Sequence, residues 1–221
     1  MPPFPQKGLP PVAGVDAALR GWIAVVLDNG AFDDARLFGD FDAVLDALTE
    51  AGVIGVDIPI GLPLEGQRRA DLAARRFVGG RRSSVFFAPV RAAFEEESYA
   101  AARARYRGIS AQAWALKHAI LEVEEHAADP RVFEVHPEVS FRALNGSALP
   151  YRKRSWNGQQ HRLRLLRAAG IELPPILDAG LAPADDLIDA AVVAWSASRI
   201  AAGQAKTLPE DPRPGEPVIS Y

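Results

Sequence analysis

The feature that most constrains the fold is an apolar stretch at residues 53–61, with the sequence Val-Ile-Gly-Val-Asp-Ile-Pro-Ile-Gly. Eight of its nine residues are apolar, glycine or proline, and a helix stop precedes it at Gly52. A short apolar run that is rich in β-branched residues predicts a central strand, buried on both faces. Its one ionisable residue, Asp57, lies near the carboxyl end of that strand. Because a lone buried carboxylate is costly, the stretch predicts a partner for Asp57.

A second copy of the same pattern, Val-Ala-Gly-Val-Asp at residues 12–16, ends in Asp16. If the two strands are parallel neighbours, both carboxylates lie at one level, because adjacent strands are about 4.8 Å apart. Two carboxylates at that separation repel each other unless a divalent cation binds both. The pair therefore predicts a metal site. The alternative is that each Asp is only a turn-forming residue at the end of a buried strand.

A long helix expected over residues 184–202 brings further acids. Asp186 and Asp189 are three residues apart, so they share one helix face and both can approach a metal. Asp189 lies within the apolar stripe that must face the core, which favours a functional role. Asp186 also has a purely structural explanation, since an acid near the first turn interacts favourably with the helix dipole.

A strand expected over residues 132–136 carries Glu134 and His136, which alternate with apolar residues. At a spacing of two they project to one face of the strand, near its carboxyl end, where α/β sheets place their ligands. Both are candidate catalytic residues, with His136 orienting or protonating a reacting group. The alternative is a structural histidine whose hydrogen bonds are satisfied.

Two segments are strongly basic, although the net charge of the chain is −3. Residues 68–107 contain ten arginines and four acids, and residues 151–167 contain six basic residues and no acid. The overall charge argues against a general polyanion-binding protein, but two local basic segments can bind a phosphate-bearing ligand. The candidate phosphate-binding or nucleic-acid-binding residues are Arg81, Arg82, Ser83, Lys153 and Arg154. The alternative is that both segments are solvated helix faces.

The order of expected elements predicts an α/β fold in one domain spanning residues 1–221. Three strands (residues 12–16, 22–27 and 35–38), with turns at 18–21 and 28–30, predict an antiparallel meander. A helix over 40–51, the strand at 53–61 and the strand at 132–136 predict parallel strands beyond it. Residues 65–128 are expected to form a mostly helical basic insertion, with one long helix over 110–127, and residues 145–160 a polar loop.

Five motifs together resemble domain-of-unknown-function family 429, a family of predicted nucleases of the ribonuclease H-like fold. They lie at residues 14–16, 55–61, 80–86, 134–141 and 185–190. The resemblance implies a mixed sheet flanked by helices, with acids on two strands and a late helix. Ribonuclease H itself carries an acid on its first helix, whereas Asp42, Asp46 and Glu50 are expected here on a solvated face. The layout is thus nearer to the Holliday-junction-resolvase-like branch of the fold.

These features predict a metal-dependent nuclease that hydrolyses phosphodiester bonds. Asp16, Asp57 and Asp189, with Asp186 or Glu134, would bind Mg²⁺ or Mn²⁺, which prefer oxygen ligands. Two ions about 3.5–4 Å apart would activate a water and stabilise the leaving oxygen. The substrate is expected to be nucleic acid or a nucleotide.

Two other functions remain open. One is a non-catalytic ribonuclease H-like module that binds an anionic ligand or partner through its arginines. The other is phosphoryl transfer to or from a small molecule, as in sugar kinases and actin-like ATPases of the same fold. No glycine-rich phosphate loop of the Walker type accompanies the acids, which argues against the second.

The composition limits the chemistry and the cellular location that we expect for the protein. The chain has no cysteine, which excludes disulfides and thiolate metal sites. Residues 1–8 lack the apolar core of a signal peptide, and no segment is long and apolar enough for a membrane span. We therefore expect a cytoplasmic protein with no membrane contact. The sequence does not indicate an oligomeric state.

Overall fold

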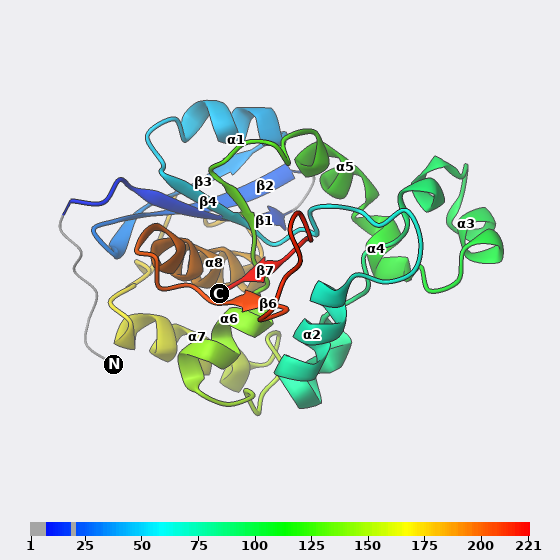
Figure 1. Ribbon diagram of the computed structural model, residues 1–221. Coiled ribbons are helices and arrows are strands. Elements are labelled where there is room, and N and C mark those ends of the chain that lie inside the picture. Colours follow the sequence, from blue (N-terminus) through cyan, green and yellow to red (C-terminus); the bar gives the residue numbers. More distant parts are fainter. Residues whose placement is uncertain (1–7, 19–20) are drawn as a thin grey trace.

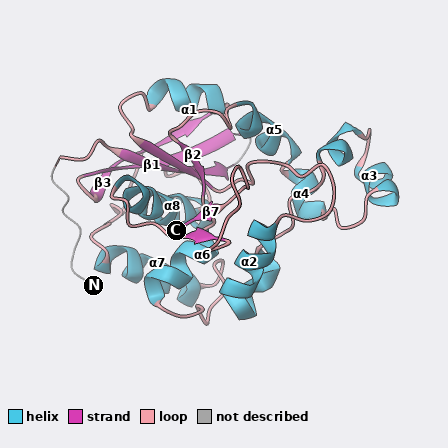
Figure 2. Ribbon diagram, in the orientation of Figure 1, coloured by secondary structure: helices cyan, strands magenta, loops and turns pink. Residues whose placement is uncertain are grey.

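The computed structural model describes residues 8–18 and 21–221. Its centre is a five-stranded mixed sheet with the order β3-β2-β1-β4-β5, flanked by helices (Figures 1 and 2). The strands are β1 (Val12–Ala18), β2 (Gly21–Asp28), β3 (Ala31–Phe38), β4 (Val53–Val56) and β5 (Val132–Glu134). β1, β2 and β3 pair in antiparallel fashion, while β4 and β5 run parallel to β1. This confirms the predicted antiparallel meander followed by parallel strands.

The meander is closed by a two-residue turn between β2 and β3. Asn29 and Gly30 both have positive φ angles, 49° and 79°, as a type I′ hairpin turn requires. The predicted turn at residues 18–21 includes Leu19 and Arg20, which lie outside the described residues, as does most of the N-terminal segment assessed for a signal peptide.

Helices cover both faces of the sheet, with α1 on one side and α8 on the other (Figure 1). The helices are α1 (Phe41–Ala47), α2 (Arg69–Val78), α3 (Tyr99–Arg105), α4 (Ala111–Ala115), α5 (Lys117–Glu125), α6 (Pro137–Asn145), α7 (Trp156–Ala168) and α8 (Ala184–Ala201), with 3-10 segments η1 (Gly79–Ser84) and η2 (Arg91–Glu95). Among the described residues, no helix is long and apolar enough to cross a bilayer.

The side chains of β1 alternate between two hydrophobic clusters. Ala13 and Val15 belong to the cluster that includes α1 and α5, whereas Val12 belongs to the cluster that includes α8. Because successive side chains of a strand point to opposite faces, Gly14 and Asp16 lie on the α8 face with Val12. β4 repeats this arrangement, since Ile54 and Val56 are in the first cluster.

Several elements differ from the sequence prediction. The strand within residues 53–61 ends at Val56, and the Asp57 N–H makes the last hydrogen bond to β1. Pro59 has no N–H to continue the ladder, and the amides of Ile60 and Gly61 donate to the carboxylates of Glu134 and Glu124. The helix expected over 110–127 is broken at Leu116 into α4 and α5. α7 begins inside the segment expected to be a loop, because the Ser155 hydroxyl accepts the Gly158 N–H and caps it.

The C-terminal segment adds a small second sheet. β6 (Thr207–Leu208) pairs in antiparallel fashion with β7 (Ile219–Ser220), and an isolated bridge joins Val135 to Ser220. Leu208, Ile219 and Tyr221 pack with α2 and α6 in a third hydrophobic cluster. The end of the chain thus lies beside the carboxyl end of β5 (Figure 1).

Gly14 allows α8 to lie directly on the sheet. A Cβ added to Gly14 would lie 2.1 Å from both the Ala190 carbonyl oxygen and the Ala194 backbone nitrogen. On β4, a Cβ added to Gly55 would lie 2.9 Å from Val193 Cγ1. The glycine of each repeated Gly-Val-Asp motif therefore sets the distance between the sheet and α8.

We expect Gly14→Ala to destabilise the protein by about 3 kcal/mol or more, because the obstacle is a helix backbone and not a flexible side chain. Urea unfolding followed by circular dichroism measures the change. The control is Gly39→Ala, since a Cβ at Gly39 meets no atom within 4 Å and its expected effect is within about 0.5 kcal/mol. Equal stability of the two variants would contradict this role of Gly14.

Candidate metal centre

The register of β1 and β4 places Asp16 beside Asp57. Val15 is paired with Val56 in the parallel ladder, and the Asp57 N–H donates to the Val15 carbonyl oxygen at 2.9 Å. Asp16 directly follows Val15 and Asp57 directly follows Val56, so both carboxylates leave the sheet at one level. The predicted parallel pairing of the two Gly-Val-Asp strands is confirmed.

Helix α8 adds Asp189 to this pair. Asp189 directly precedes Ala190, whose carbonyl lies against Gly14, so the close helix–sheet contact carries its side chain to the strand ends. Carboxylate oxygens of Asp16, Asp57 and Asp189 all lie within 4.8 Å of one another. Asp16 and Asp189 are buried and Asp57 is partly buried. Two oxygen atoms that each lie about 2.0–2.6 Å from one ion are separated by at most about twice that distance. The spacing of these carboxylates therefore fits a hard divalent cation.

The environment of the three carboxylates opposes their ionisation. Burial raises the pKa of Asp16 well above its usual value, and the charges of Asp57 and Asp189 raise it further. Burial is also the main cause that raises the pKa of Asp57 and of Asp189 to about 7. Like charges in a poorly solvated site need compensation, which a bound cation would provide.

One basic side chain supplies part of that compensation. Lys153 lies in the loop before α7, and its Nζ is 2.6 Å from Asp189 Oδ2 and 3.6 Å from Asp185 Oδ2. Asp189 and the other acids raise the pKa of Lys153 above its usual value, although burial opposes this. Arg154 pairs with Asp185 through Nε at 2.9 Å. The structure therefore places both predicted phosphate-binding residues of this loop against acids.

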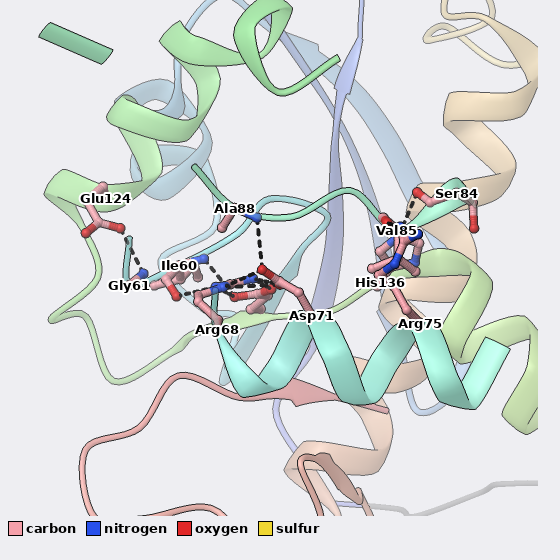
Figure 3. Close-up of polar contacts among 11 residues, drawn as sticks. Ile60, Gly61, Arg68, Asp71, Arg75, Ser84, Val85, Ala88, Glu124 and His136 are labelled. Atoms are coloured by element: carbon pink, nitrogen blue, oxygen red, sulfur yellow. Dashed lines mark hydrogen bonds and ion pairs between the residues drawn. The ribbon is translucent and has the colours of Figure 1, made fainter. Parts of the chain in front are cut away.

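Glu134 lies apart from the three aspartates and is engaged with Arg68. Its carboxylate accepts from both terminal nitrogens of Arg68 at 2.7 and 2.8 Å and from the Ile60 N–H at 2.7 Å. Arg68 also binds Asp71, which accepts from the Ala88 N–H at 2.9 Å (Figure 3). This buried network holds the loop after β4, and the structure does not bring Glu134 into the acidic cluster.

His136 faces the same cleft as the aspartates, but its ring is held by the backbone. Its Nδ1 accepts the Glu138 N–H at 3.2 Å and so caps α6, while Nε2 lies 3.3 Å from the Ser84 carbonyl oxygen (Figure 3). With Nδ1 as the acceptor, the proton lies on Nε2 and the ring is neutral. Burial lowers the pKa of His136, in keeping with this tautomer.

The acids form the floor of a cleft of about 830 Å³. Arg81 and Ser83 of η1 line it, with Arg81 Nε donating to the Leu149 carbonyl oxygen at 3.1 Å. Arg82 is exposed and does not line the cleft. Asp186 lies on its wall, outside the set of three converging carboxylates, and its pKa is raised by burial and by Asp185.

Sequence reasoning did not name several residues that line the cleft, among them Glu138, Phe86 and Gln112. Glu138 is buried in the first turn of α6 and forms an ion pair with Arg162, which is also buried. Phe86 and Gln112 line the cleft from the helical region between β4 and β5. Glu138 follows His136 and Pro137 in the motif at residues 134–141, which was the available signal for it. Phe86 is the last residue of the motif at residues 80–86, which was the available signal for it, whereas nothing local to Gln112 indicates a site.

The fold and site define a mixed α/β protein with a buried acidic cluster that could hold a metal ion. The chain belongs to the family described as protein of unknown function (DUF429), whose family model matches residues 14–213. A search of curated proteins finds no match to the chain, and neither does a search of solved structures.

The raised pKa values predict that the metal-free protein loses stability as the pH rises. A carboxyl group whose pKa is about 3.9 unfolded and about 7 folded stabilises the fold fully below pH 4, and that contribution is gone above pH 7. In EDTA, Asp57→Asn should therefore raise the free energy of unfolding relative to wild type more at pH 8 than at pH 5, by on the order of 2 kcal/mol.

Urea unfolding at the two pH values measures this difference. The control is Asp46→Asn, which changes an exposed acid of α1 and should shift the stability equally at both values. An effect of Asp57→Asn that does not grow with pH would mean that the folded protein does not raise the pKa of Asp57.

Proposed function

We propose that the protein is a divalent-metal-dependent nuclease of the ribonuclease H-like fold that hydrolyses phosphodiester bonds. The observation that carries this proposal is the convergence of Asp16, Asp57 and Asp189 within 4.8 Å at the floor of a cleft lined by arginines. A carboxylate cluster of this kind suits Mg²⁺ or Mn²⁺, which take oxygen ligands. The bound ions would activate a water nucleophile and stabilise charge on the leaving oxygen.

The strand order supports the ribonuclease H-like assignment. An antiparallel β3-β2-β1 unit is followed by parallel β4 and β5, and the acids lie on β1, after β4 and on the late helix α8. Asp42, Asp46 and Glu50 on and after α1 are exposed and remote from a buried site, which favours the resolvase-like arrangement of acids over that of ribonuclease H itself.

The residues of this chain have separate roles in the proposal. The three aspartates hold the metal, and Arg81, with Ser83 beside it, contacts a phosphate group of the substrate across the cleft. Lys153 balances the charge of Asp189 until a cation binds, and its partly exposed ammonium is then available to a phosphate oxygen. His136 and Glu134 position α6 and the loop after β4.

A non-catalytic module that binds an anionic ligand is the second candidate, and one observation favours it. The Lys153 ammonium already lies 2.6 Å from Asp189, so a chain that never binds metal still has partial charge compensation. This candidate predicts ligand binding that survives loss of the aspartates and fails when Arg81 is replaced.

The nuclease proposal predicts that Asp57→Asn lowers Mn²⁺-dependent cleavage of labelled single-stranded, duplex or branched oligonucleotides by at least about 100-fold. The expectation is a lower bound, because loss of an outer-shell partner alone commonly costs about 10- to 100-fold. Gel electrophoresis of the products, with and without EDTA, measures the rate. Asp46→Asn, an exposed acid of α1, is the matched control and should cleave at the wild-type rate. Unchanged cleavage by Asp57→Asn would overturn the assignment.

A further inference from the structure

A second hollow, of about 330 Å³, lies between α2, α6, α8 and the C-terminal segment. We call it the basic groove. Three aromatic rings and three cations line it, and no acidic side chain does. These residues are Phe77, Arg142, Trp195, Arg199, Lys206 and Tyr221.

The aromatic rings hold two of the cations in place. The Arg142 guanidinium lies over the Phe77 ring at 5.1 Å, and the Arg199 guanidinium lies over the Trp195 ring at 5.0 Å. Lys206 is exposed and directly precedes β6. Within residues 8–18 and 21–221, neither arginine nor Lys206 forms an ion pair with an acid. No side-chain carboxylate of the described residues therefore binds these three cations directly.

One hydrogen-bond donor of the Arg199 side chain has no partner. Its Nη2 donates to the Gln204 carbonyl oxygen at 2.7 Å, but its Nε is buried and has no hydrogen-bond partner. An unpaired buried donor on a charged group is costly, and an anion in the groove would offset the positive charge of the same guanidinium group. A phosphate suits a groove lined by three cations, because guanidinium groups bind its oxygens with two parallel hydrogen bonds.

The groove and the acidic cleft share two helices. Arg142 in the groove is four residues after Glu138 in the cleft, so both lie on one face of α6, about one turn apart. Phe77, in the last turn of α2, lines the groove, and the chain continues past Val78 into Gly80 and Arg81 in the cleft. A ligand with phosphates at regular intervals can therefore contact both.

We propose that the basic groove binds phosphate groups of a nucleic acid strand that continues from the acidic cleft. Arg142, Arg199 and Lys206 hold the phosphates. The substrate is then a polynucleotide rather than a mononucleotide. The link to the cleft rests on the proposed nuclease function, whereas phosphate binding in the groove does not.

The test is binding of a fluorescein-labelled single-stranded 12-nucleotide oligomer, followed by fluorescence anisotropy in EDTA over a series of KCl concentrations. The variant Arg142→Gln with Lys206→Gln should weaken binding at least about 10-fold and lower the slope of log affinity against log salt by about 1.4, as loss of two phosphate contacts to a single strand predicts. The control, Arg103→Gln with Arg107→Gln, removes the same charge from exposed positions at and beyond the end of α3. It should change the affinity less than twofold.

Equal weakening by the two double variants, or no weakening by either, would overturn the groove proposal. Lys206→Glu alone is a second variant, because Lys206 is exposed and makes no side-chain hydrogen bond that folding needs; wild-type affinity in that variant would also contradict it. Displacement of the oligomer by ATP at equal phosphate concentration would show that free nucleotide is the ligand, and would overturn the proposal that the groove binds a nucleic acid strand. If ATP does not displace the oligomer, the result supports a nucleic acid strand as the ligand.

The experiments distinguish failure of the nuclease proposal from failure of the groove proposal. Because the anisotropy is measured in EDTA, a groove that binds the oligomer is detected even if Asp57→Asn leaves cleavage unchanged. Conversely, metal-dependent cleavage that Asp57→Asn abolishes stands even if the groove variants bind normally.

Discussion

Mutual repulsion among three buried carboxylates is the interaction on which the rest of this structure depends. Asp16, Asp57 and Asp189 lie within 4.8 Å of one another, and burial, together with the charges of neighbouring acids, holds their pKa values high. Such an arrangement is unfavourable by itself, so the fold must enforce it. A cation that binds all three would turn this unfavourable arrangement into a stabilising one.

Backbone contacts hold the three carboxylates together. The parallel register of β1 and β4 fixes Asp16 beside Asp57, and Gly14 lets the backbone of α8 approach the sheet closely enough to bring in Asp189. Neither constraint can relax without breaking strand hydrogen bonds or moving a helix off the central sheet. The carboxylates therefore cannot separate, and Lys153 is the partner that reduces their repulsion.

The acidic cluster was predictable because its causes are local. Two copies of Gly-Val-Asp fix strand ends, and an acid within an apolar helical stripe identifies Asp189. The contacts of Glu134 and Lys153 were not predictable, since they depend on where distant loops fold back. Glu134 meets Arg68 across the loop after β4, and Lys153 reaches Asp189 from the loop before α7. The order of the strands follows from turns and periodicity, and Pro59, which cannot extend the ladder, accounts for the end of the strand just beyond Asp57.

A crystal soaked with Mn²⁺ tests the central claim most directly, through the anomalous difference density of the metal. The account predicts a peak within about 2.0–2.6 Å of oxygens from Asp16, Asp57 and Asp189, with Lys153 displaced from Asp189. No peak between the three carboxylates, with the Lys153–Asp189 contact intact at saturating Mn²⁺, would contradict it.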